Sequence, residues 1–195
     1  MNRFRYARAG RRSTVSPGPD RWDGLNPETA WEPWSPADGD VWDLAKVAHL
    51  HRRAGFGATW KQLEADAART PAEVVRGLLD AATTTGPAED DSVADVIAAG
   101  SEARRLASWW LLRMVRGSSA VRERLTLFWH GHFATSAAKV EQTRLMLAQY
   151  RTLRELGQGE FGALARAISC DPAMLVWLDC RESRKAKPNE NFARE

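Results

Sequence analysis

The strongest chemical signal in this 195-residue chain is a pair of histidines next to a dense apolar and aromatic run. His130 and His132 flank Gly131 and directly follow a Phe-Trp dipeptide. Imidazole nitrogens bind metal ions and protons, and they are costly beside an apolar surface unless a partner satisfies them. We therefore expect any chemistry of this protein to lie in the segment 125–136.

Two histidines separated by one residue can share a metal ion only if the chain between them turns, because on a helix they diverge by about 200°. Gly131 can end the helix and let both imidazoles converge in a turn. A metal needs further ligands, and Glu190 and Glu195 are the best carboxylates because they lie in a segment that Asn189 can open as a cap. The sequence thus predicts a divalent metal site made of His130, His132 and Glu190.

The alternative is a structural role for both histidines. In that case one of them hydrogen-bonds a carbonyl at a helix end, and the other packs against Trp129. A second pair, His49 and His51, lies in a strongly helical segment, so its side chains diverge and a shared metal is not expected. Here we expect His49 to hydrogen-bond within the core.

Helical periodicity dominates the chain after residue 40, and no alternating strand pattern of useful length occurs. Asp40 is the expected cap of the first helix, and Thr59 and Thr70 open capping boxes. A polar linker is expected at 83–91. The predicted fold is all-α and multi-helical, with mostly antiparallel helices, over the ranges 41–54, 60–69, 71–81, 102–116, 121–129, 137–156 and 161–168 and a short segment from 172.

Residues 1–40 are expected to form an irregular arm rich in Arg, Pro and Trp, ahead of a helical domain at 41–195. Trp22, Trp31 and Trp34 can anchor this arm on the body or form a basic-aromatic nucleic-acid interface. Acidic residues among these tryptophans favour the anchoring role. The net charge of +3 also gives no support to nucleic-acid binding.

Composition excludes several other classes. No apolar run approaches 18 residues, so no membrane span is expected. The two cysteines, Cys170 and Cys180, are too few for a disulfide framework and match no zinc motif. Because no apolar export signal follows the N-terminal arginines, we expect a cytoplasmic protein.

Four segments in order resemble an uncharacterised bacterial family known as domain of unknown function 1800. They are residues 48–58, 125–136, 171–179 and 188–195. The resemblance implies a largely helical protein of unknown activity and supplies no catalytic residues to carry over. His51 and Cys180 depart from the family pattern. Family members also continue past residue 195 with an apolar helix, so we expect the helical domain to be an incomplete fragment.

The sequence leaves two functional interpretations open. One is a metal-assisted enzyme built on His130, His132 and Glu190. The other is a non-catalytic helical scaffold or partner-binding module, which the nine tryptophans and the lack of a complete catalytic set favour. Its partner would be another protein or the missing C-terminal half.

Overall fold

The computed structural model describes residues 26–28, 32, 34, 36, 40–83, 92–100, 102–117 and 119–194. The chain divides into two units, Met1–Ala37 and Asp38–Glu195, and everything below concerns the second. Most of the expected N-terminal arm, including Trp22 and Trp31, lies outside the described residues, as does most of the linker expected at 83–91.

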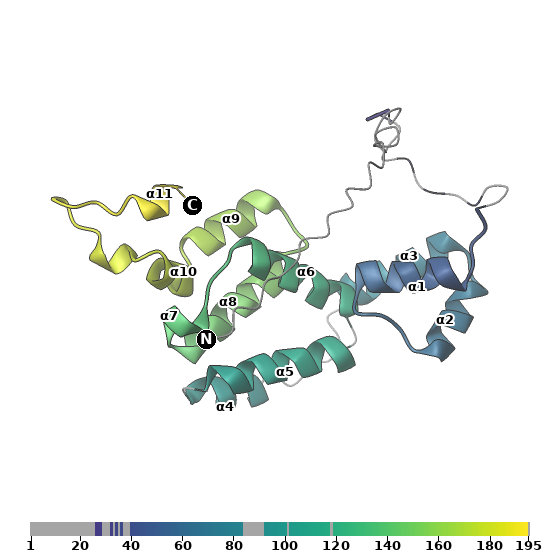
Figure 1. Cartoon of the computed structure of the whole chain (residues 1–195), viewed down its shortest axis with the longest axis horizontal. Helices are drawn as coiled ribbons and strands as arrows, with labels where there is room; N and C mark the ends of the chain where they lie inside the picture. Colours follow the sequence, from purple (N-terminus) through teal and green to yellow (C-terminus); the bar gives the residue numbers. More distant parts are fainter. Residues whose placement is uncertain are drawn as a thin grey trace, which may run out of the picture. The chain divides into compact units, whose positions relative to one another are not determined.

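The described part of the second unit is built from helices, which confirms the all-α prediction (Figure 1). An isolated β-bridge joins Arg184 and Lys187. None of the described helices combines the length and apolar character needed to span a bilayer. The helices are α1 (Leu44–Ala54), α2 (Trp60–Ala67), α3 (Pro71–Thr83), α4 (Ser92–Ala99), α5 (Ala103–Arg116), α6 (Ala120–His132), α7 (Ala137–Val140), α8 (Thr143–Leu156), α9 (Phe161–Ser169), α10 (Pro172–Trp177) and α11 (Asn191–Arg194), with a 3-10 turn at Cys180–Glu182.

Capping residues explain where several helices begin. Thr59 and Gln62 form the predicted capping box of α2, and Thr70 and Glu73 exchange equivalent hydrogen bonds at the start of α3. The first helix differs from the prediction, because its cap is Asp43 and not Asp40. The Asp43 carboxylate accepts a hydrogen bond from the backbone N–H of Lys46 at 2.9 Å, so α1 begins three residues later than expected.

The single helix predicted over 137–156 is wrong, because it is divided into α7 and α8. Glu141 adopts a left-handed conformation with φ of 60°, which a continuous right-handed helix does not tolerate. Ser136 caps α7 by accepting from the N–H of Ala138 at 3.2 Å. The break turns the chain so that α7 contacts α10 while α8 runs through the core.

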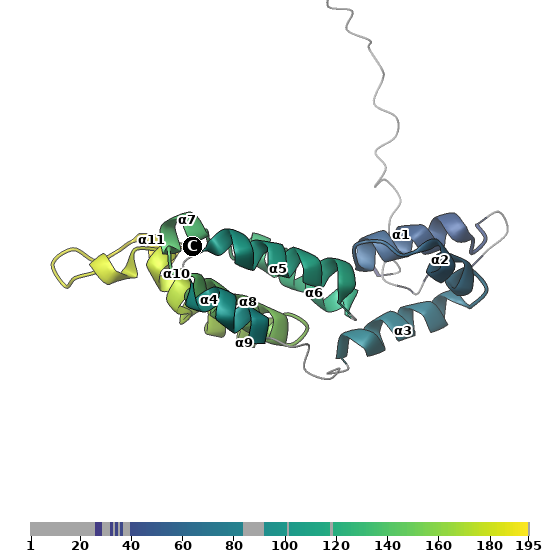
Figure 2. The same cartoon turned by 90° about the horizontal axis from the view of Figure 1, so that it is seen from below.

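Helix α8 is the centre of the fold. It packs against α4, α6, α9 and α10, and Figures 1 and 2 show it running beside α9. Leu147 faces α4 and α5, whereas Leu153 joins Leu164 and Ile168 in a second buried cluster. Burial of such side chains supplies the main favourable free energy of folding. This core fixes the C-terminal end of α6, where the histidines lie.

Helix α6 also contacts the first helices of the unit. Its partners there are α1 and α3. At the junction Gly55, the residue that ends α1, lies so close to α6 that an added Cβ would be 2.8 Å from the Cβ of Ala120. A glycine is needed at this position because any side chain would collide with α6.

Candidate functional site

The histidine pair lies on α6, and the turn expected at Gly131 is wrong. The helix continues through Gly131 to His132, and the N–H of Phe133 still bonds the carbonyl of Trp129 at 2.8 Å. The cost of glycine inside a helix is about 1 kcal/mol, which the aromatic packing of Trp129 and Phe133 offsets. The two imidazoles therefore point to different sides of α6.

Each histidine lines a different cavity. His130 lines a cavity of about 280 Å³ between α5, α6 and α8, which we call the His130 cavity. His132 lines a larger cavity of about 660 Å³ between α6, α7, α9, α10 and α11, which we call the His132 cavity. The spacing of two residues on a helix thus places the two imidazoles at two separate cavities.

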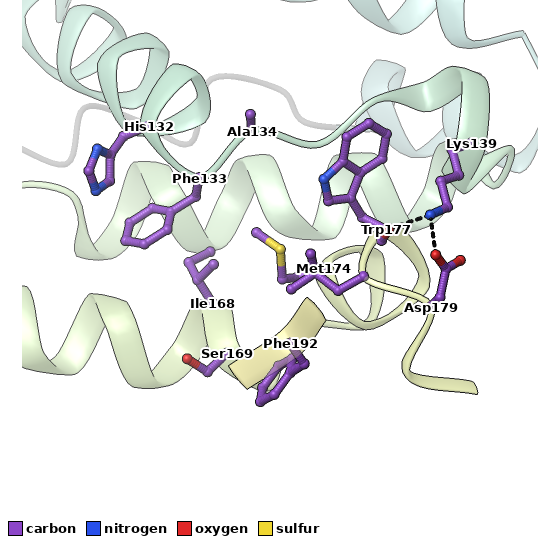
Figure 3. Close-up of a pocket in the computed structure, with 11 residues that line it drawn as sticks. His132, Phe133, Ala134, Lys139, Ile168, Ser169, Met174, Trp177, Asp179 and Phe192 are labelled. Carbon is purple, nitrogen blue, oxygen red and sulfur yellow. Dashed lines mark hydrogen bonds and ion pairs between the residues drawn. The ribbon is translucent and has the colours of Figure 1, made fainter. Parts of the chain in front are cut away.

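The walls of the His132 cavity are mainly apolar and aromatic. Figure 3 shows Phe133 on one side facing Ile168 and Met174, with Phe192 of α11 near Ser169. The apolar lining consists of Phe133, Ile168, Met174, Trp177, Leu178 and Phe192. Within the described residues, the ring contacts of the His132 imidazole are with Phe128, Trp129 and Phe133.

An ion pair forms the polar edge of the His132 cavity. The ammonium of Lys139 donates to the Asp179 carboxylate at 2.7 Å and to the carbonyl of Trp177 at 2.6 Å, as drawn in Figure 3. The same ammonium lies 5.5 Å from the centre of the Trp177 ring. Asp179 has a left-handed backbone with φ of 57°. The pair holds the end of α10 to α7 and contributes no net charge to the cavity.

The walls of the His130 cavity carry three large aromatic side chains. Trp109 and Trp110 both meet Tyr150 edge to face, with ring centres 5.3 Å and 5.1 Å apart. The imidazole of His130 meets the Trp110 ring edge to face at 5.4 Å. Burial lowers the pKa of His130 below its ordinary value, because an apolar environment disfavours the charged imidazolium.

The buried carboxylate of Glu123 lies behind this aromatic wall, and the sequence analysis did not identify it. Glu123 is only 1% exposed, and its carboxylate accepts from Arg154 Nε at 2.7 Å and from Arg113 Nε at 3.3 Å. It also accepts from the indole N–H of Trp110 at 3.0 Å and the hydroxyl of Tyr150 at 3.0 Å. We call these five residues the Glu123 cluster. It fixes the orientation of two rings that line the His130 cavity.

The Glu123 cluster has an electrostatic consequence for Tyr150. Burial and then the neighbouring carboxylate raise the pKa of Tyr150 well above its ordinary value, so its hydroxyl stays protonated and donates to Glu123. One sequence signal pointed to the cluster. Arg113 falls on the apolar stripe of its helix with Leu106 and Trp110, and a guanidinium in that position needs a buried carboxylate.

A hydrogen-bonded chain holds the segment between the two cavities. The hydroxyl of Thr135 donates to Gln149 Oε1 at 2.5 Å, and Gln149 Nε2 donates to Asp171 Oδ1 at 2.9 Å. The same carboxylate caps α10 by accepting from the N–H of Met174 at 3.0 Å. Burial raises the pKa of Asp171, and this effect outweighs the hydrogen bonds from Met174 and Gln149, which favour the charged carboxylate.

Glu190 lines neither of the two cavities. Its exposed carboxylate pairs with Arg194 one helical turn later at 3.2 Å. Asn189 donates its amide to the carbonyl of Leu178. Across the described part of the chain, no three His, Cys, Asp or Glu side chains gather closely enough to hold a metal ion. The metal site therefore stays a prediction.

The second histidine pair diverges as predicted, but the roles within it are reversed. His51 is the buried member, and its Nε2 is 2.9 Å from the Asp66 carboxylate of α2. His49 is exposed, so the expectation that it hydrogen-bonds within the core is wrong. Asp66 also pairs with Arg69 at 3.1 Å. This arrangement joins α1 to α2.

A comparison with models of protein families shows the family to which the chain belongs. A family model described as protein of unknown function, DUF1800, matches residues 49–195. No curated protein and no solved structure matches the chain. The matched range contains every residue of both cavities and of the Glu123 cluster. The chain therefore belongs to the DUF1800 family, whose members are described as proteins of unknown function.

Proposed function

We propose that this protein is a non-catalytic binding module that takes an uncharged, largely apolar small molecule in the His132 cavity. The observation that carries the proposal is the cavity itself, with a volume of about 660 Å³ and an aromatic and aliphatic lining. Binding sites for small molecules typically enclose 300–1,000 Å³ and are lined mainly by apolar side chains. The His132 cavity has both properties.

The polar groups at the His132 cavity favour a binding role over a catalytic one. Lys139 and Asp179 neutralise one another, and the hydroxyl of Ser169 donates to the carbonyl of Ala165 at 2.7 Å. A catalytic site needs a base within hydrogen-bond distance of the group it activates. Among the described residues, the side chains in contact with the His132 imidazole are the rings of Phe128, Trp129 and Phe133, which do not accept or relay a proton.

The test uses Nile red, an uncharged fluorescent dye, titrated into the full chain. We expect saturable binding to one site. Ser169→Phe should abolish Nile red binding, because the new ring fills the cavity. Position 169 is exposed, so the larger side chain does not disturb the core. Phe192→Ala should weaken binding about tenfold by removing part of the apolar wall, which corresponds to about 1.4 kcal/mol.

Phe56→Ala is the matched control for the wall variant. Phe56 and Phe192 have similar exposure, 38% and 40%, but Phe56 lies in the loop after α1. We expect this control to bind Nile red as the wild type does. Circular dichroism of every variant checks that the helices are intact. Nile red binding that stays at wild-type strength in a folded Ser169→Phe variant would refute the proposal.

A further inference from the structure

The His130 cavity is independent of the proposed function, because it lies on the other side of α6 and shares no lining residue with the His132 cavity. Its volume of about 280 Å³ is roughly twice that of an engineered apolar cavity of about 150 Å³ known to bind benzene. A site of this size suits one or two fused rings.

The lining of the His130 cavity selects for ring-shaped ligands. Trp109, Trp110 and Tyr150 meet edge to face, and Leu106 and Met146 complete the apolar wall. Aromatic rings prefer such edge-to-face and offset contacts with other rings. Because the Glu123 cluster holds Trp110 Nε1 and the Tyr150 hydroxyl, these two rings are oriented before any ligand arrives.

His130 supplies a polar group within this aromatic wall. Apart from its ring contact with Trp110, no hydrogen bond to the imidazole is found within the described residues. An imidazole in apolar surroundings gains from a ligand that donates an N–H or O–H to it. The hydroxyls of Thr135 and Tyr150, which also line the cavity, already donate to Gln149 and Glu123.

The charges behind the wall disfavour a cation. The Glu123 cluster contains two guanidiniums and one carboxylate, so its formal charge is positive. The Arg113 guanidinium also lies over the Trp109 ring, with 5.3 Å from Cζ to the ring centre. The Arg113 guanidinium therefore already occupies a face of the Trp109 ring that would attract a cationic ligand.

From these observations we propose that the His130 cavity binds an uncharged aromatic molecule of one or two rings that carries a hydroxyl or N–H donor, as phenols and indoles do. The rings of the ligand contact Trp109, Trp110 and Tyr150. Its donor group hydrogen-bonds to the His130 imidazole. No bond is made or broken, so the site is a second binding site and adds no reaction.

The test compares para-cresol with toluene, which has the same ring and methyl group but no hydroxyl. Both are titrated into the full chain and followed by ligand-observed NMR. We expect para-cresol to bind about tenfold more tightly than toluene in the wild type. In His130→Ala this preference should disappear, while the His132→Ala control, altered two residues along the same helix, should keep it.

Two further arms keep the test decisive if His130→Ala is poorly folded. Ala107 is exposed and lines the cavity, so Ala107→Trp should fill the cavity and abolish binding of both compounds. Ser108, the next residue, is exposed but does not line the cavity, so Ser108→Trp should leave binding unchanged. Ser169→Phe should leave para-cresol binding intact, which separates this site from the His132 cavity.

Benzyltrimethylammonium provides the test of charge. Three aromatic rings can form a site for quaternary ammonium ions, and tight binding of this cation would overturn the proposal. Failure of para-cresol to bind saturably would also overturn it. So would a para-cresol affinity that is the same in folded Ala107→Trp and in the wild type.

Discussion

Gly131 separates the two histidines without interrupting α6, and an alanine at this position tests that geometry. A Cβ at Gly131 would meet no atom within 4 Å, and its φ lies outside the left-handed region. Gly131→Ala should therefore raise the free energy of unfolding by about 0.5–1 kcal/mol, because alanine loses less backbone entropy in a helix. Urea denaturation measures the change. Destabilisation would instead indicate the turn expected from the sequence.

Zinc binding tests the metal site that the sequence predicts at His130, His132 and Glu190. Both imidazoles can reach one metal ion only if α6 opens between them. We expect zinc to leave the helical circular dichroism of the full chain unchanged, and the metal content after dialysis to be equal in wild type, His130→Ala and His132→Ala. A zinc content that falls in both variants would support the predicted metal site.

Glu123 is the side chain whose loss should cost most outside the apolar core. Glu123→Gln removes the only carboxylate of the Glu123 cluster and leaves Arg113 and Arg154 facing each other near a buried position. Removing one partner from a buried ion pair costs about 3–5 kcal/mol. Urea denaturation should show a loss of this order. Glu190→Gln, which alters an exposed pair, is the control and should change stability little.

At the scale of helices, the break between α7 and α8 depends on the left-handed residue Glu141. A non-glycine residue in that conformation costs about 1–2 kcal/mol, and glycine adopts it without this penalty. Glu141→Gly should therefore raise the melting temperature. Glu64→Gly, at an exposed position inside α2, is the control and should lower it by the usual cost of a helical glycine. A fall in both variants would show that residue 141 is helical.

Helix α4 shows why one element escaped prediction. Its buried residues are Ala94 and Ala98, whereas Val93 and Val96 are exposed. Both valines thus lie on the solvent side while Ile97 packs against the core, so the hydrophobic periodicity does not mark the packed face. The small alanines are buried because α4 packs closely against α8 and α5. The capping boxes at Thr59 and Thr70, by contrast, are local and were predicted correctly.

At the scale of the whole unit, α6 connects the first helices to the part that carries the cavities. Gly55 and Ala120 form the closest approach of that junction. Gly55→Ala should destabilise the protein by about 1–3 kcal/mol, as overpacking does. Adding Ala120→Gly should restore part of the loss, because it removes the colliding methyl group.

Two measurements test the predicted contact between Gly55 and Ala120. Urea denaturation of the two single variants and the double variant gives the coupling between the two positions. Nile red binding should be unchanged in all three, since neither residue lines the His132 cavity. Purely additive losses would mean that the two positions do not touch.

The family was recognisable from the resemblance of four segments of the sequence. The sequence by itself also determined the helical fold and several caps, because these follow from periodicity and from hydrogen bonds over three or four residues, which are local. Only the tertiary structure decided that His130 and His132 face two different cavities and that Glu190 lines neither of them. It also brought Glu123 together with arginines from two other helices. Such contacts join residues far apart in the chain, and packing against α8 selects them over local alternatives.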